Sequence, residues 1–360
     1  MYNRESEYDY LRVFSMLAVI MMHVSVHWID GFSYAVFQGT DIEELIHPFA
    51  ACMYYSLSAF AVPCFIMVSG AFILDNDNNA DYARFYKKSF QKIGVPTLIF
   101  TGLYSILNIL ELAASGNLSL DGLKEIVIND ISGWPYYHMW YMFMIIGIYL
   151  LAPFMVIIKN KTGYGSFRKI SIVFFVYSVV SAWTYKGNTV NWDIGYVIYF
   201  LGYFMIGYVL RKETKRTKIP GLVFLIMGIL VEANTAFVYY DIKFIKGLDG
   251  AEKFLKPLSP LMAMAAILIF YGFGRLRLKY SWLVEKTAGL SFIIYMFHGG
   301  VWGGVKTIIG KIKGEYYLIQ LDNIWAIPIG IAVVFLISVL LSLAYEKVYS
   351  SARQVFTRRD

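Results

Sequence analysis

Residues 8–28 read YDYLRVFSMLAVIMMHVSVHW, and this stretch decides the fold class. A helix that crosses a membrane needs about 20 mostly apolar residues, and residues 10–29 meet that requirement. The residues before this run are not predominantly basic, and the run is longer than the apolar core of a signal peptide. We therefore expect it to remain in the protein as a spanning helix.

The same criterion, applied along the rest of the chain, predicts ten spans separated by short polar breaks. To within a few residues the predicted spans are 10–29, 49–74, 85–110, 139–158, 169–185, 194–210, 219–239, 257–274, 287–309 and 324–346. This pattern predicts an all-α fold, a polytopic membrane helical bundle with about ten transmembrane helices. Because no break is long enough for a soluble domain, we expect a single integral membrane domain over residues 1–360.

The composition supports a membrane protein and excludes several other classes. Of the 360 residues, 32 are Lys or Arg and 25 are Asp or Glu, so only 16% are charged, whereas 58% are apolar. The mean hydropathy is +0.55. So few charges cannot cover a soluble surface, which excludes an ordinary cytosolic enzyme, a disordered chain and a nucleic-acid-binding protein despite a pI near 9.0.

Neither disulfide nor metal chemistry is expected. Cys52 and Cys64 lie twelve residues apart in one apolar run, which is about 18 Å along a single helix and too far for a disulfide. The histidines have no cysteine or carboxylate partners at the intervals of metal ligands. They are His23, His27, His47, His138 and His298.

The loop charges predict the orientation in the membrane. With ten spans both termini lie on one side, and that side carries 22 Lys and Arg residues against eight in the opposite loops. Positive loops are retained in the cytoplasm. We therefore expect a multi-pass protein of the cell membrane with both termini cytoplasmic, whose basic collar contacts lipid headgroups.

Ionisable residues inside spans are costly and mark candidate functional sites. Arg12 and His23 are eleven residues apart, a helical rotation only about 20° from eclipsed, so they share one face about 16 Å apart along the axis. Asp9, three residues before Arg12, lies on the same side and is expected to orient it. This geometry predicts an anion clamp at the cytoplasmic end and a buried proton acceptor. The alternatives are that Arg12 snorkels to the interface and that His23 is a packing residue.

Several motifs resemble the membrane acyltransferase-3 family, which includes surface-polysaccharide O-acetyltransferases. The resemblance begins with Asp-x-Leu-Arg and the Arg12–His23 spacing and runs to about residue 300. The other matching stretches are VPCFIMVSG, FYKKSFQKIGVP, HMWYMFMIIGIYLLAPF, FLGYFMIGYVL and SFIIYMFHG. Because no attached soluble domain is expected, the chain resembles the enterobacterial-common-antigen type and the membrane half of serine-racemase resistance proteins.

The chain departs from the family pattern at three positions. Many members carry two arginines three residues apart before the proline of the third span, where this chain has Ser89 and Lys92. A lysine is a weaker bidentate phosphate ligand than an arginine. Tyr141 stands where phenylalanine is usual.

The resemblance implies transfer of an acyl group, most often acetyl from cytoplasmic acetyl-CoA, to a hydroxyl of a carbohydrate or similar acceptor. A neutral imidazole in a span suits removal of the acceptor proton, so His23 is the expected general base, and an acyl-carrier role stays open. Arg12, Lys88 and Lys92 are expected to bind the phosphates of CoA. Ser69 is expected at this donor site, where it or Tyr141 supplies a donor to the thioester oxyanion.

The resemblance also implies acceptor contacts at His138, Trp140, Tyr141 and His298. Purely structural roles remain open as alternatives. His138 and Trp140 would then belong to an aromatic belt at the membrane interface, and Ser69 with Gly70 would serve helix packing. Glu232, a lone carboxylate in the seventh span, has no assigned role.

The competing function is a transporter of a small polar solute such as an amino acid. Transporters often contain internal repeats and broken helices, and the sequence shows neither clearly. Among the functions considered, a structural or sensory membrane module is the least favoured, because such a function does not require Arg12 and His23. The sequence does not predict an oligomeric state.

Overall fold

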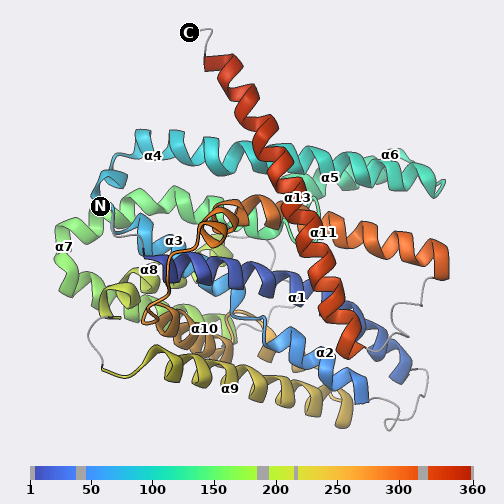
Figure 1. The fold of residues 1–360 in the computed structure, drawn as a ribbon, viewed down its shortest axis with the longest axis horizontal. Helices are drawn as coiled ribbons and strands as arrows, with labels where there is room; N and C mark the ends of the chain where they lie inside the picture. The colour runs from blue at the N-terminus through green and yellow to red at the C-terminus, as the bar shows by residue number, and fades with distance from the viewer. Residues whose placement is uncertain (1–4, 38–45, 185–193, 215–217, 315–322, 358–360) are drawn as a thin grey trace. The chain divides into compact units, whose positions relative to one another are not determined.

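The computed structural model describes residues 5–37, 46–184, 194–214, 218–314 and 323–357. These residues form helices and turns, with no β-strand among them (Figure 1). Eight of their helices are long and apolar enough to cross a membrane. The all-α polytopic membrane bundle predicted from the sequence is thus confirmed.

The chain divides into two compact units, and the first combines Met1–Cys64 with Ile219–Asp360. In this unit α1 packs against α2, α11 and α13, and α9 lies beside α10 (Figure 1). Its helices are α1 (Ser6–Phe37), α2 (Ile46–Ser56), the start of α3 (Ala61–Ile73), α9 (Gly221–Tyr240), η4 (Asp241–Ile245), η5 (Ala251–Leu255), α10 (Pro260–Phe273), α11 (Trp282–Lys313) and α13 (Asn323–Thr357).

The second unit is Phe65–Lys218. In it α4, η3 and α5 follow one another as one helical run, which contains an apolar stretch long enough to span a membrane, and α7 packs against α8. Its helices are the rest of α3, η2 (Asp77–Ala80), α4 (Tyr82–Ser89), η3 (Phe90–Gly94), α5 (Val95–Ala114), α6 (Leu120–Ile131), α7 (Trp140–Thr184) and α8 (Ile194–Glu213).

Each of the ten predicted ranges contains helical residues, but α7 and α8 differ from the predicted spans. The predicted spans 139–158 and 169–185 belong to α7, which bends at Gly163, where φ is 74° and ψ is 162°. Only glycine adopts that backbone conformation without strain. The predicted span 194–210 lies on α8, which is not among the eight candidate spans.

The predicted span 49–74 corresponds to a candidate span over Phe49–Ile73, but it is not one continuous helix. α2 ends at Ser56, residues 57–60 form turns, and α3 begins at Ala61. Pro63 lies in the first turn of α3, where it needs no hydrogen bond. A continuous helix would instead set its ring against the carbonyl of Ala59. Cys52 and Cys64 therefore lie on different helices, and both are buried free thiols.

Two glycines let α3 and α8 approach closely. A Cβ atom on Gly70 would lie 1.7 Å from the Phe204 carbonyl oxygen, and one on Gly207 would lie 2.2 Å from the Met67 carbonyl oxygen. Small residues at membrane helix contacts permit such backbone approach. Gly70 therefore has a packing role.

At the C-terminal end of α3, backbone carbonyl groups accept hydrogen bonds from side chains of the same unit. Lys159, 7% exposed, donates to the Leu74 carbonyl oxygen at 2.6 Å. Arg211 donates to the Ala71 carbonyl oxygen at 3.1 Å. Asn79 donates to that of Ile73 at 2.8 Å. Cations favour the negative end of a helix, so part of the basic collar has a structural role.

Candidate functional site

Asp9, Arg12 and His23, which are predicted to share one face of the first span, lie on one unbroken helix, α1. Arg12 Nη1 donates to Asp9 Oδ1 at 2.8 Å, so the carboxylate is placed to orient the guanidinium. Asp9 is buried, whereas the Arg12 side chain is 29% exposed. The ion pair with Asp9 thus orients the Arg12 guanidinium, and the exposed part of the Arg12 side chain can contact solvent or a ligand.

His23 faces a second histidine from α11. The ring centroids of His23 and His298 are 5.2 Å apart. His298 is fully buried, and its Nδ1 contacts the Tyr295 carbonyl oxygen at 2.5 Å. Because a carbonyl only accepts, Nδ1 carries the proton of a neutral ring, which makes Nε2 a proton acceptor. The structure therefore pairs two imidazoles whose predicted roles are separate: general base for His23 and acceptor binding for His298.

Beyond this pair, aromatic and polar side chains continue along the seam of α1 and α11. His27 lies one helical turn beyond His23, and its ring centroid is 6.0 Å from that of Trp302. Trp302, one turn beyond His298, stacks with Trp28 at 6.3 Å. Lys306 lies over the Trp302 ring at 5.8 Å. Among the described residues, His27 Nε2 and Trp28 Nε1 are buried without a hydrogen-bond partner.

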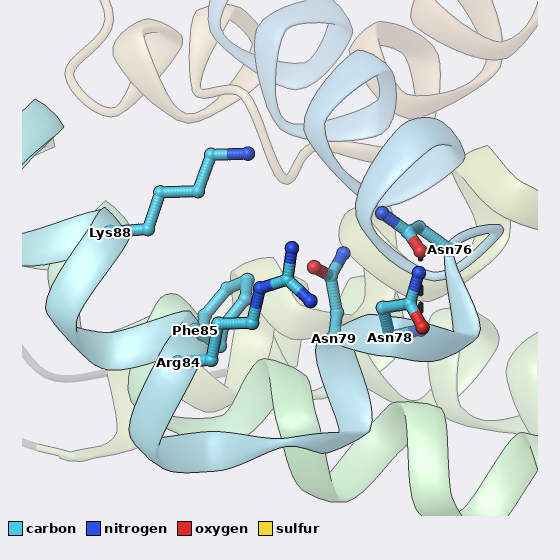
Figure 2. Close-up of a pocket in the computed structure, with 6 residues that line it drawn as sticks. All are labelled: Asn76, Asn78, Asn79, Arg84, Phe85 and Lys88. Carbon is cyan, nitrogen blue, oxygen red and sulfur yellow. Dashed lines mark hydrogen bonds between the residues drawn. The ribbon is translucent and has the colours of Figure 1, made fainter.

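The donor residues predicted outside α1 belong to the second unit. Lys88 lines a pocket of about 50 Å³ at the start of α4 (Figure 2). Lys92 is exposed on the π-helical segment η3 and does not line this pocket. Ser69 is half-buried on α3. The other residues lining the pocket are Asn76, Asn78, Asn79, Arg84 and Phe85.

The predicted acceptor residues of the second unit are packed among aromatic rings. His138 is fully buried immediately before α7, with the rings of Tyr104, Tyr136 and Tyr137 at 5.3 to 5.6 Å. Trp140 packs on Tyr196 and Phe200, and buried Tyr141 lies 6.5 Å from Phe65. These contacts support a packing role. Within the first unit, the structure brings His298 together with His23.

Glu232, which had no role from sequence, joins α9 to the break in the second span. Its carboxylate oxygen Oε1 accepts from the Phe60 backbone N–H at 3.0 Å, and its backbone carbonyl accepts from Ser56 Oγ at 2.6 Å. Glu232 is 1% exposed. It therefore satisfies a backbone donor that the interrupted helix leaves without an internal partner.

Replacing Glu232 by leucine is expected to destabilise the protein, because the buried Phe60 N–H would lose its acceptor. A buried unsatisfied donor costs about 1–3 kcal/mol. Glu232→Gln retains an acceptor oxygen and is expected to lie closer to the wild type in thermal unfolding of the detergent-purified protein. Equal melting temperatures for the leucine variant and the wild type would contradict the capping role.

No group of three His, Cys, Asp or Glu side chains within the described ranges is placed to hold a metal ion.

Comparison with protein-family models identifies the family of this chain. Residues 5–343 match the family model for the acyltransferase domain of the acyltransferase-3 type. Neither the comparison with curated proteins nor that with solved structures found a match. The matched residues cover nearly the whole chain and include both units. This multi-pass membrane protein therefore belongs to the acyltransferase-3 family.

Proposed function

We propose that the protein transfers an acyl group, foremost acetyl, from cytoplasmic acyl-CoA to a hydroxyl of a cell-envelope carbohydrate or related acceptor. The observation that carries the proposal is that His23, on the same helix as the Asp9–Arg12 ion pair, lies beside His298 of α11. Family membership supports acyl transfer over the transporter interpretation.

The imidazole pair supports a general-base reaction. The acceptor hydroxyl oxygen attacks the thioester carbonyl carbon while His23 takes the hydroxyl proton. The resulting oxyanion collapses, the carbon–sulfur bond breaks, and the CoA thiolate leaves and recovers the proton from the imidazolium. His298, whose Nδ1 is tied to the Tyr295 carbonyl, presents Nε2 as a second acceptor that orients the groups around His23.

Arg12 is the proposed anion ligand for the donor. Asp9 fixes the guanidinium about 16 Å from His23 along α1. An extended thioester arm with phosphates at its far end suits such a separation. In the proposed orientation, with both termini cytoplasmic, Arg12 meets the donor at the inner membrane surface, which is the side that the loop charges favour.

The acceptor is proposed to approach from the opposite direction, along the seam of α1 and α11. His27 and Lys306 offer hydrogen bonds there, and Trp302 offers an aromatic surface. Sites for small polar molecules combine such an aromatic wall with a few polar groups. His138, Trp140 and Tyr141 keep their proposed acceptor role on the family resemblance alone.

The direct test is transfer of radiolabelled acetyl from acetyl-CoA into a cell-envelope extract by the purified protein in vesicles. We expect Arg12→Lys to raise the KM for acetyl-CoA about tenfold, because lysine keeps the charge but loses the planar fork. The melting temperature should change little. Arg277→Lys, at an exposed position of the same unit, is the matched control.

Two results would count against the proposal. Absence of acetyl-CoA-dependent labelling by the wild type would remove the donor assignment. If Arg12→Lys lowers thermal stability as much as donor affinity, Arg12 serves the fold rather than the donor.

A further inference from the structure

Two stacked indoles lie in the seam of α1 and α11, directly beyond the imidazole pair. Trp28 follows His23 by five residues and Trp302 follows His298 by four, so both lie about 6–8 Å further along their helices, on the side away from Arg12. The ring centroids are 6.3 Å apart, and the ring planes differ by 20°. Trp28 is 1% exposed and Trp302 is 2% exposed. The indole pair therefore occupies the seam next to the imidazole pair.

Neighbouring side chains and a third helix pack around the indole pair. The His27 ring meets both indoles edge-on, with its centroid 5.6 Å from that of Trp28 and 6.0 Å from that of Trp302. Lys306 Nζ lies 5.8 Å from the centroid of the Trp302 ring, whose face attracts its charge. α13 packs against both α1 and α11, and a Cβ atom on its Gly330 would lie 3.8 Å from Trp302 Cζ3. Three helices therefore enclose the stacked rings.

Two nitrogen atoms of this cluster have no hydrogen-bond partner among the described residues. They are His27 Nε2 and Trp28 Nε1, and both atoms are buried. A buried polar atom without a partner costs about 1–3 kcal/mol, and an apolar side chain would fill the same space without that cost. An indole N–H only donates, whereas a ring nitrogen of neutral histidine donates or accepts. The two atoms therefore match hydroxyl groups, which do both.

The position of the indole pair bears on a competing reaction of the proposed mechanism. His23 would take a proton from water as readily as from a hydroxyl acceptor. The water oxygen would attack the thioester carbonyl carbon, the carbon–sulfur bond would break, and the proton would pass from His23 to the CoA thiolate. The acyl group would then be lost as the free acid. Enzymes prevent such hydrolysis by excluding water from the site, and two buried indoles exclude it from this side of His23.

We propose that Trp28 and Trp302 determine the choice of acceptor, so that the acyl group passes to a polyhydroxylated molecule and not to water. With the rings stacked, water does not reach His23 through the seam. A carbohydrate that bonds His27 Nε2 and Trp28 Nε1 supplies the partners that these atoms lack, and this differential interaction favours the open arrangement that admits it. The role in acyl transfer rests on the proposed function, whereas closure of the seam by the rings does not.

The first test measures hydrolysis of acetyl-CoA without an acceptor, as release of CoA thiol by the full-length protein in nanodiscs. Trp302→Leu removes the stacked ring but keeps an apolar side chain, and we expect it to raise the hydrolysis rate about tenfold. Trp302→Phe keeps an aromatic ring in the seam and should stay near the wild-type rate. Trp282→Leu is the matched control on the same helix. Trp282 also has a lysine over its ring, Lys286 at 5.3 Å, but it is 63% exposed, so its replacement should leave the rate unchanged.

The second test measures access to position 23 and needs no acyl donor. His23→Cys is combined with Cys52→Ala and Cys64→Ala, and a membrane-impermeant methanethiosulfonate reagent is added outside intact cells that express the protein. Labelling should be slow with Trp302 in place and about tenfold faster with Trp302→Leu. Trp28→Leu removes the ring of the other helix and should act in the same direction in both tests, so it replaces Trp302→Leu if that variant does not fold.

The outcomes separate this inference from the proposed function. If wild type transfers acetyl groups but the leucine variants hydrolyse acetyl-CoA no faster than wild type, the inference is overturned and the proposed function stands. Unchanged labelling at position 23 would likewise overturn it, because the rings would not close the seam. If labelling rises but no form of the protein turns over acetyl-CoA, the closed seam stands, whereas the acyl donor and the role in acceptor choice fail. The melting temperature verifies that each leucine variant is folded.

Discussion

His23→Ala is expected to lower acetyl transfer by about 10²- to 10⁴-fold, the usual contribution of a positioned general base. The imidazole of His23 is the group paired with His298 in the first unit, and alanine leaves no side chain to take the acceptor proton. The measurement is the initial rate of label transfer from acetyl-CoA at saturating donor, with the melting temperature recorded for the same preparation.

The variant His23→Gln distinguishes a role of His23 as general base from a role in packing. Glutamine retains bulk and hydrogen bonding but does not accept a proton at neutral pH. If His23 is the base, the glutamine variant is as inactive as the alanine variant, although it is folded. Recovery of activity in His23→Gln would show that the histidine has a packing role. A labelled acetyl group found on His23 after acid quenching would make it an acyl carrier instead.

Gly70→Ala is expected to cause the largest loss of stability among the substitutions considered. The new Cβ would lie 1.7 Å from the Phe204 carbonyl oxygen and 2.9 Å from its Cα. Both are backbone atoms, which no rotamer change can move. The helices α3 and α8 must therefore separate, and we expect a loss of about 3 kcal/mol, the upper end of the usual cost of overpacking. Melting temperature and detergent-purified yield measure it.

Gly102→Ala is the matched control for this substitution. Gly102 is exposed on α5 of the same unit, and a Cβ there meets nothing within 4 Å. Alanine in a helix is favoured over glycine by about 0.5–1 kcal/mol, so the control should equal or exceed the wild type in stability. If Gly70→Ala matches Gly102→Ala, the close approach of α3 and α8 is not what stabilises this unit.

The positions of the spans could be predicted because hydropathy is a local property. All ten ranges contain helical residues. The α-helix α6, which lies outside them, has only 12 residues, too few for a criterion based on membrane thickness. The interruption at residues 57–60 had one local signal, Pro63. Its second determinant, Glu232, is more than 170 residues away, and such a contact leaves no periodicity in the sequence.

In the candidate site, too, local contacts could be predicted from the sequence, whereas contacts between distant segments could not. Asp9 and Arg12 are three residues apart on a helix, so their contact follows from helical geometry. His23 and His298 lie on helices far apart in the chain, and their pairing depends on how α1 packs against α11. The pocket was missed because Asn76, Asn78 and Asn79 suggest only a turn. A run of amides ending at the helix cap Asp81 was the available signal.

The imidazole pair joins an early helix to a late one, and this has a consequence for biosynthesis. A nascent chain that has released α1 into the bilayer carries Arg12 and His23 but lacks His298 until the ribosome has translated most of the message. The partly inserted polypeptide therefore lacks the His23–His298 pair, on which the proposed acyl transfer depends, until α11 is in place.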